Sequence, residues 1–142
     1  MVREYLESVF EQSVPQLGGN GLLARRIAVS LARNLGQSAK MSTLARDVYA
    51  GVEEYVLSEA ERKSLSRHLD ILKQLFLMDE VLGWVPASRA PQRMRVKPKR
   101  YFADPSIAVA LLGMSPAALL QDWQTFGLVF ENLVMRDLDV YA

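Results

Sequence analysis

A run of basic residues is the part of this sequence best suited to chemistry with a ligand. Six cations fall within twelve residues, with no acid among them: Arg89, Arg93, Arg95, Lys97, Lys99 and Arg100. Positive charge gathered in this way attracts the phosphate groups of nucleic acids. The run therefore predicts a loop that binds nucleic acid, with DNA as the expected partner. A solvated loop, or a partner for an acidic protein surface, has the same composition, and this reading stays open.

The sequence predicts no catalytic, metal or cofactor site. It has no cysteine, and its only histidine is His68, so a zinc site would need ligands from carboxylates alone. The phosphate loop of P-loop ATPases, the serine elbow of hydrolases and the paired histidines of metalloproteases are missing. We expect His68 to be a surface or hydrogen-bonded histidine of a helix. The glycine-rich segment 17–21 could hold an anion at a helix start, but a turn between helices explains the same residues.

Composition indicates a globular chain with an uneven charge distribution. Half of the 142 residues are hydrophobic and 23% are charged, for a net charge of +1. Beyond the basic run, acids dominate from Asp104 onward, where Arg136 is the single base. The most apolar stretch, 101–120, is interrupted by Asp104, Pro105, Gly113 and Pro116, so we expect no membrane span. Without cysteines or a targeting segment, the expected location is the cytoplasm.

Hydrophobic spacing predicts the helices that must position the basic residues. A lead-in helix should end near Pro15, and a second helix should run from about Leu22 to Leu35 with Gly36 as its cap. A short helix should follow from an N-cap at Ser42, and a third core helix from the Ser58 and Glu61 capping box. The exposed face of that third helix carries Arg62, Lys63 and Arg67, which we expect to assist in nucleic-acid binding.

Two short segments after the third helix, MDEVLGWV and KRYFA, are typical of strands and flank the basic run. The predicted fold is therefore mainly α: a winged helix-turn-helix of three helices plus a two-stranded β wing, with flanking helices. The predicted domains are a lead-in helix and linker over 1–20, the winged helix over 21–103 and a helical extension over 104–142. Asp104 with Pro105, and Ser115 with Pro116, should start the helices of the extension.

The last helix carries an apolar stripe that predicts an interface. Its members include Phe126, Val129, Phe130, Leu133 and Leu138, and the pattern reaches the final residues without a capping signal. Such a stripe indicates either that the chain continues or that the helix associates with another copy, giving a homodimer. An adaptor that binds proteins or other domains, without nucleic acid, is thus the alternative function.

Three segments together resemble a known family. KSLSRHLDILKQLFLM, KPKRYFADPSIAVALLG and FGLVFENLVMRDLDVYA are similar, in order and spacing, to the C-terminal region of prokaryotic AAA-type P-loop ATPases, a domain of unknown function. The resemblance covers nearly the whole chain and is most specific from Leu65 to Ala142. In that family an ATPase module precedes the winged helix, and a nuclease-like domain of the PD-(D/E)XK superfamily follows it.

The resemblance implies a fragment without catalysis of its own, whose missing ATPase and nuclease-like domains are its partners. No residue here matches the nucleotide-binding motifs. The extension would be the start of the nuclease-like domain, with Glu131 where its first helix carries a glutamate. The metal-holding strands have no counterpart. One departure is the long segment between Asp47 and Ser58, whose Glu53 and Glu54 argue against recognition by the third helix and leave the wing loop unaffected.

Overall fold

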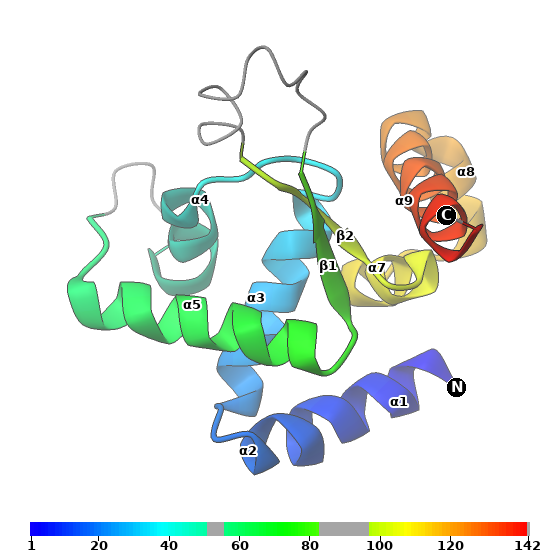
Figure 1. The fold of residues 1–142 in the computed structure, drawn as a ribbon. Coiled ribbons are helices and arrows are strands. Elements are labelled where there is room, and N and C mark those ends of the chain that lie inside the picture. Colours follow the sequence, from blue (N-terminus) through cyan, green and yellow to red (C-terminus); the bar gives the residue numbers. More distant parts are fainter. Residues whose placement is uncertain (51–55, 83–96, 142) are drawn as a thin grey trace.

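The computed structural model describes residues 1–50, 56–82 and 97–141. It is mainly helical with one two-stranded antiparallel sheet, which confirms the predicted fold class (Figure 1). The N-terminal half contains α1 (Val2–Ser8), η1 (Val9–Ser13), α2 (Val14–Gln16), α3 (Gly21–Arg33), α4 (Met41–Ala45), η2 (Arg46–Ala50) and α5 (Glu59–Gln74). The C-terminal half contains β1 (Met78–Val81), β2 (Lys99–Phe102), α7 (Pro105–Leu112), α8 (Pro116–Gln121) and α9 (Trp123–Tyr141).

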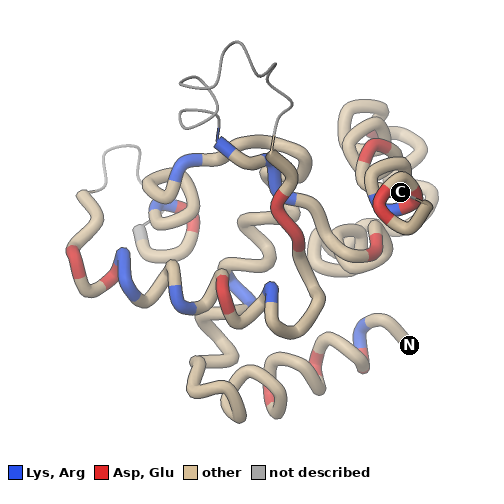
Figure 2. Tube along the Cα trace, in the orientation of Figure 1, with Lys and Arg blue, Asp and Glu red and all other residues tan. Residues whose placement is uncertain are grey.

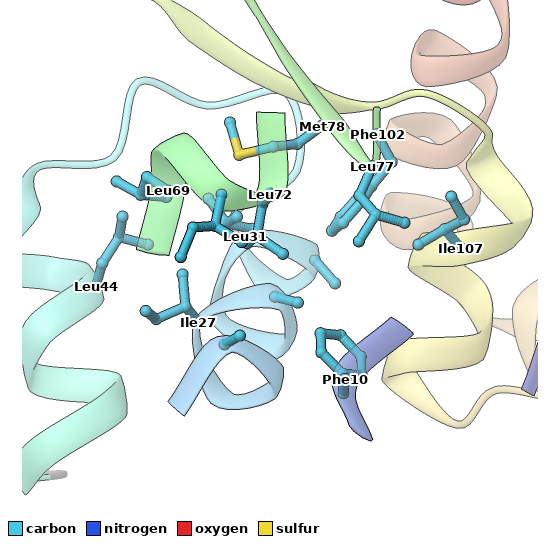
Figure 3. Packing of buried hydrophobic residues seen from close by; sticks show 14 of the residues in the cluster. Phe10, Ile27, Leu31, Leu44, Leu69, Leu72, Leu77, Met78, Phe102 and Ile107 are labelled. Carbon is cyan, nitrogen blue, oxygen red and sulfur yellow. The ribbon is translucent and has the colours of Figure 1, made fainter. Parts of the chain in front are cut away.

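Helix α3 lies at the centre and supplies the middle of the core. Ile27 and Leu31 on its buried face meet side chains of α4, α5 and the sheet (Figure 3). Leu6 and Val14 of the lead-in segment and Ile107 of α7 belong to the same cluster of buried hydrophobic residues. The lead-in helix and the first helix of the extension therefore share one core with the winged helix.

The lead-in helix ends near Pro15, as predicted. Helical backbone continues from α1 through the π-helical η1 into α2, which ends at Gln16. Proline has no N–H, and its ring clashes with the carbonyl four residues earlier in an α-helix. The wider π turn, in which the Val14 N–H donates to the Val9 carbonyl, precedes the proline and places it in the first turn of α2, where no donor is needed.

The boundaries of α3 and α4 differ slightly from the predicted ones. Asn20, instead of a residue near Leu22, caps α3, because its side chain accepts a hydrogen bond from the Leu23 N–H at 3.0 Å. Gly21 is required there since a Cβ would collide with the Phe10 carbonyl. Helix α4 begins after Lys40, so the prediction of Ser42 as its N-cap is wrong. For α5 the capping box is confirmed, with the Glu61 N–H 3.2 Å from the Ser58 hydroxyl.

The wing forms as predicted from strands β1 and β2. They pair antiparallel, with Met78 opposite Phe102 and Val81 opposite Lys99. The loop residues 83–96, which include Arg89, Arg93 and Arg95, lie outside the described residues. The base of the wing, from Lys97 onward, is described and sits against α3 and α5 (Figure 1).

Among the described helices, α2, α5 and α7 end in the same type of turn. In this turn the N–H groups of two residues after the helix donate hydrogen bonds to carbonyl groups of its last turn. At α5 the Leu77 N–H bonds the Leu72 carbonyl and the Phe76 N–H bonds the Lys73 carbonyl. This turn needs a left-handed residue, which is glycine at positions 18 and 113 but Phe76, with φ 57°, at the end of α5. Gly113 ends α7 as predicted.

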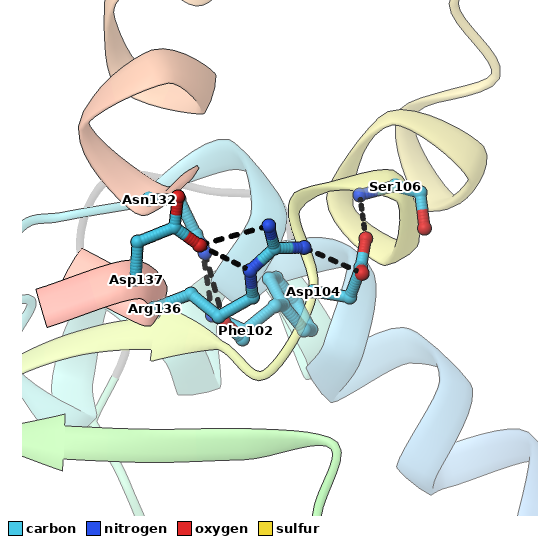
Figure 4. Close-up of polar contacts among 6 residues, drawn as sticks. All are labelled: Phe102, Asp104, Ser106, Asn132, Arg136 and Asp137. Carbon is cyan, nitrogen blue, oxygen red and sulfur yellow. Dashed lines mark hydrogen bonds and ion pairs between the residues drawn. The ribbon is translucent and has the colours of Figure 1, made fainter. Parts of the chain in front are cut away.

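Helix α9 is fixed to the wing through polar contacts (Figure 4). The amide side chain of Asn132 bonds the backbone of Phe102, and Arg136 reaches Asp104 at 3.0 Å. Asp104 itself caps α7 by accepting from the Ser106 N–H at 2.8 Å, and Ser115 caps α8 in the same way, as predicted. The base of the wing is thus held from both sides, by α3 and by α9.

Candidate nucleic-acid interface

A basic groove of about 320 Å³ opens between the start of α4, the start of α5 and the base of the wing. Among the described residues, its walls contain four cations and no carboxylate. The lining residues are Ala39, Lys40, Met41, Ser42, Arg62, Lys97, Pro98 and Arg100. Because like charges repel, a set of cations facing one hollow favours an anion between them. The groove can therefore accept phosphate groups.

Local structure explains why three of these cations point outward. Lys40 is the N-cap of α4 and Arg62 lies in the exposed part of the first turns of α5. Lys97 precedes β2, where its carbonyl accepts a hydrogen bond from the Ser38 hydroxyl at 3.1 Å. That bond ties the wing base to the segment before α4. All three side chains belong to exposed residues, and none of them takes part in the ion pairs found among the described residues.

Arg100 has a different role from the expected phosphate contact. Its side chain is only 13% exposed. One nitrogen lies 3.2 Å from a Glu80 oxygen, and another donates to the Ala39 carbonyl at 2.9 Å. Lys73 of α5 pairs with the other Glu80 oxygen at 2.9 Å. Arg100 thus anchors the wing to the segment before α4 and contributes positive potential from the groove floor, without a guanidinium free in solvent.

The Glu80 carboxylate holds these two cations. Burial would raise the pKa of Glu80, but the hydrogen bond and charge of Lys73, together with Arg100, outweigh burial and lower that pKa below its usual value. Glu80 is therefore ionised when the wing is folded at neutral pH. Its charge joins β1 and β2 to the end of α5.

Lys99 lies on the opposite side of β2 from Arg100 and points toward α9. Its ammonium is 3.6 Å from Glu131, and the same Glu131 oxygen accepts a hydrogen bond from the Tyr101 hydroxyl at 2.6 Å. Burial, followed by the Glu131 carboxylate, raises the pKa of Tyr101 above its usual range. Half-exposed pairs such as Lys99 with Glu131 contribute little to stability. Glu131 thus joins α9 to the wing.

The remaining predicted cations of α5 lie on its exposed face. Figure 2 shows basic positions along α5 and at the base of the strands. Lys63 and Arg67 are exposed, and neither forms an ion pair within the described parts of the chain. Sequence reasoning missed Lys40, because a single lysine between two helices gives no periodic signal. Its position next to a helix start was the only available indication.

A second groove, of about 480 Å³, lies on α3 and η2. It contains Arg25, Arg26 and Arg33, but it also contains the carboxylate of Asp47. Asp47 accepts a hydrogen bond from the Ser30 hydroxyl at 2.7 Å. The carboxylate reduces the positive potential of this groove, which makes it the weaker candidate for phosphate.

His68 is buried, and both of its ring nitrogens are hydrogen-bonded. Of the two expected alternatives, a surface histidine or a hydrogen-bonded one, the structure shows the second. Its Nε2 accepts from the Asn20 N–H at 2.9 Å, and its Nδ1 lies 2.6 Å from the Ser64 carbonyl. Because a carbonyl can only accept, Nδ1 carries the proton and the imidazole is neutral. Neither nitrogen is left for a metal or a substrate. Within the described ranges, no group of three histidine, aspartate or glutamate residues could hold a metal ion.

The apolar stripe predicted on the last helix divides between two faces of α9. Val129 packs on the core, and Phe126 and Leu133 are half-buried, whereas Phe130 and Leu138 are exposed. The outer face is a row that we name the α9 stripe: Trp123, Gly127, Phe130, Val134, Leu138 and Tyr141. No helix in the described part of the chain is long and apolar enough to span a membrane.

Three core helices followed by a β ribbon, with a basic groove between the third helix and the ribbon, define a winged helix-turn-helix protein. The predicted long segment between Asp47 and Ser58, with Glu53 and Glu54, falls in part on residues 51–55, which lie outside the described residues. The chain belongs to the family described as "Domain of unknown function (DUF8612)", whose model matches residues 1–118. Comparison with curated proteins and with solved structures gave no match.

Proposed function

We propose that this protein is a winged-helix module that binds nucleic acid through the basic groove and has no catalytic chemistry of its own. The observation that carries the proposal is that Lys40, Arg62 and Lys97 come together around one hollow, with no carboxylate in its walls in the part of the chain that the structure describes. Phosphate neutralisation by lysine and arginine supplies most of the affinity of nonspecific nucleic-acid binding. Duplex DNA is the expected ligand.

The sequence around the groove supports a larger basic surface. Lys63 and Arg67 extend it along α5, and the cations Arg89, Arg93 and Arg95 precede Lys97 directly in the sequence. In winged helices the third helix and the wing both approach the duplex, and the groove lies between these elements. Contacts between side-chain cations and the phosphate backbone of DNA position a protein on the duplex but carry no sequence information. We therefore infer binding that depends on charge more than on base sequence.

Fluorescence anisotropy with a labelled duplex tests the proposal. If about six phosphates are neutralised, affinity falls by about a thousandfold between 50 and 200 mM salt. The double variant Arg62→Gln with Lys97→Gln should bind more weakly and should reduce the slope of log affinity against log salt by about 2. The matched control, Arg26→Gln with Arg33→Gln, removes the same charge from α3 and should keep the native slope.

Two results would contradict the proposal. The first is no binding to duplex DNA at low salt. The second is an equal loss of slope in both double variants, which would mean that overall charge, and not the groove, attracts the duplex. In either case the alternative function, an adaptor that binds proteins or other domains, becomes the better hypothesis. The exposed apolar row of α9 is the observation that favours that alternative.

We further propose, on the resemblance to the C-terminal region of AAA-type P-loop ATPases, that the module acts in the cytoplasm with an ATPase domain and a nuclease-like domain as partners. Neither activity is assigned to the residues of this chain. The gene's reading frame tests this proposal directly. A P-loop motif encoded in the same polypeptide upstream of residue 1 would support it, and an isolated short gene would overturn it.

A further inference from the structure

The α9 stripe is an apolar surface that no other described element covers. Helix α9 lies at the edge of the molecule, and its outer side faces away from the core (Figure 1). Asn132, on the opposite side of the helix, is fully buried. The side chains of the stripe have exposed fractions from 38% at Val134 to 87% at Tyr141. A row of this kind marks an interaction surface.

The stripe is complementary to itself when two copies run antiparallel. With a twofold axis at the level of Asn132, Trp123 of one copy lies across from Tyr141 of the other. The large Phe130 then meets Val134, and the small Gly127 lies across from Asp137, one residue or about 1.5 Å along the helix from Leu138. Around Gly127, where a Cβ would point, there is nothing within 4 Å, so a leucine side chain has space to enter. In a twofold interface the same patch must fit itself, and alternating large and small residues satisfy that requirement.

The charged residues of α9 are compatible with antiparallel packing of two copies. No residue of the stripe is charged. Of the charged residues along α9, Glu131 is engaged with Tyr101 and Lys99, and Arg136 is engaged with Asp104 and Asp137. In the antiparallel pair Asp137 lies near Gly127 of the other copy, so like charges do not face each other. Asp137, which borders the stripe and is half exposed, is paired with Arg136 of its own helix.

The exposed area is sufficient for a specific dimer. Aromatic side chains bury about 150–250 Å² each, so three partly exposed aromatics with Leu138 and Val134 offer on the order of 600 Å² per copy. Two copies together then bury on the order of 1,200 Å², which is the lower limit for specific protein interfaces. Trp123, Phe130 and Tyr141 are also of the types that contribute most to binding energy.

We propose that the protein forms a homodimer in which the α9 stripes of two copies pack antiparallel about a twofold axis. The occupant of the stripe is a second copy of this chain. The inference is independent of nucleic-acid binding, because the basic groove shares no residue with the stripe. Each dimer would then contain two basic grooves, one from each copy.

Light scattering on the full chain provides the first test. The native protein should show about twice the monomer mass of 16.0 kDa at a concentration of about 100 µM. Leu138→Glu places a charge within the apolar interface and should weaken the dimer by about tenfold or more. Leu22→Glu is the matched control, since Leu22 on α3 is 63% exposed and Leu138 is 60% exposed. That variant should remain dimeric, and circular dichroism should show both variants folded.

Cross-linking determines the direction of the helices. The natural chain has no cysteine, so introduced thiols react only with each other. A mixture of Gly127→Cys and Leu138→Cys chains should form a disulfide between the two variants, because these positions lie within about 1.5 Å of the same level along the paired helices. Each variant alone should not, since identical positions lie about 15 Å apart for Gly127 and about 18 Å apart for Leu138 along the antiparallel helices. A monomeric native protein, a dimer unaffected by Leu138→Glu, or efficient self-cross-linking of Gly127→Cys would each overturn the proposal.

Discussion

The side chain of Asn132 makes both hydrogen bonds that a neighbouring strand would make to Phe102. Its oxygen accepts from the Phe102 N–H at 2.9 Å, and its nitrogen donates to the Phe102 carbonyl at 2.8 Å. The two residues are separated by thirty positions in the chain, and Asn132 has no exposed surface. The free edge of β2 is thus satisfied by a helix side chain, and α9 is fixed in register with the wing.

Replacing Asn132 should destabilise the protein strongly. Asn132→Leu leaves two buried backbone groups of Phe102 without partners, and each such group costs about 1–3 kcal/mol. We expect the free energy of unfolding to fall by about 2–4 kcal/mol in urea titrations followed by circular dichroism. Gln124→Leu, an exposed change on the same helix, serves as the control and should stay within about 0.5 kcal/mol of the native value. Equal stability of the two variants would contradict the assignment.

His68 should be required for the junction between α3 and α5. His68→Ala removes the acceptor of the Asn20 N–H and leaves a cavity beside Asn20. Together these effects should cost about 2–4 kcal/mol of unfolding free energy. The exposed neighbour Arg67 provides a comparison, since Arg67→Ala should change stability by less than about 0.5 kcal/mol. A His68→Ala protein with native stability would show that the hydrogen bond to Asn20 contributes nothing.

A glycine in place of Phe76 should stabilise the C-terminal end of α5. Phe76 has a left-handed backbone, which is strained for a bulky residue, and its side chain is 83% exposed, so little packing is lost on its removal. Phe76→Gly should raise the midpoint of thermal unfolding, corresponding to about 0.5–1 kcal/mol. Phe76→Ala keeps most of the backbone strain and should give no comparable gain. If Phe76→Ala stabilised the protein as much as Phe76→Gly, the gain would come from removal of the exposed aromatic side chain and not from relief of backbone strain.

The ion pairs of Glu80 should make stability depend on acidity. The pKa of Glu80 is lower in the folded protein than its ordinary value of 4.5, so the unfolded chain binds the proton more readily. This contribution is fully present above pH 4.5 and is lost as the pH falls through the lower, folded value. Because the group is partly exposed, we expect about 0.5–1 kcal/mol.

Glu80→Gln is the variant that isolates this effect. Between neutral pH and pH 3, its unfolding free energy should fall less steeply than that of the native protein in chemical denaturation. Some slope should remain, because Asp104 also has a lowered pKa, caused first by its hydrogen bonding to Ser106 and then by Arg136. Identical slopes for the variant and the native protein would refute the role given to Glu80.

Signals that act over a few residues made much of the fold predictable. The Ser58 box, the Asp104 cap and the glycine at 113 act within one helical turn, and the structure confirms them. The two strands of the wing were predictable for the same reason, since strand composition is local. The end of the lead-in helix near Pro15 was also predicted, but the π segment of η1 that precedes the proline leaves no marker in the sequence.

Partners distant in sequence could not be predicted from periodicity. Nothing in the residues around Asn132 indicates that its amide will meet Phe102, because that contact arises only when α9 packs on the wing. The same limit explains the candidate site. The cations of α5 and the wing were expected from composition, but the engagement of Arg100 by Glu80 and the contribution of Lys40 depend on tertiary packing.

The alternation of side chains in β2 restricts where the length of the chain can change during evolution. Arg100 turns toward Ala39 and Glu80, whereas Tyr101 turns toward Glu131. An insertion of one residue between Lys99 and Tyr101 would exchange these faces and break the attachment to the segment before α4 and to α9 at once. An insertion before Lys97 leaves this alternation intact. Natural relatives should therefore differ in length before Lys97 and keep a constant spacing from Lys99 to Phe102.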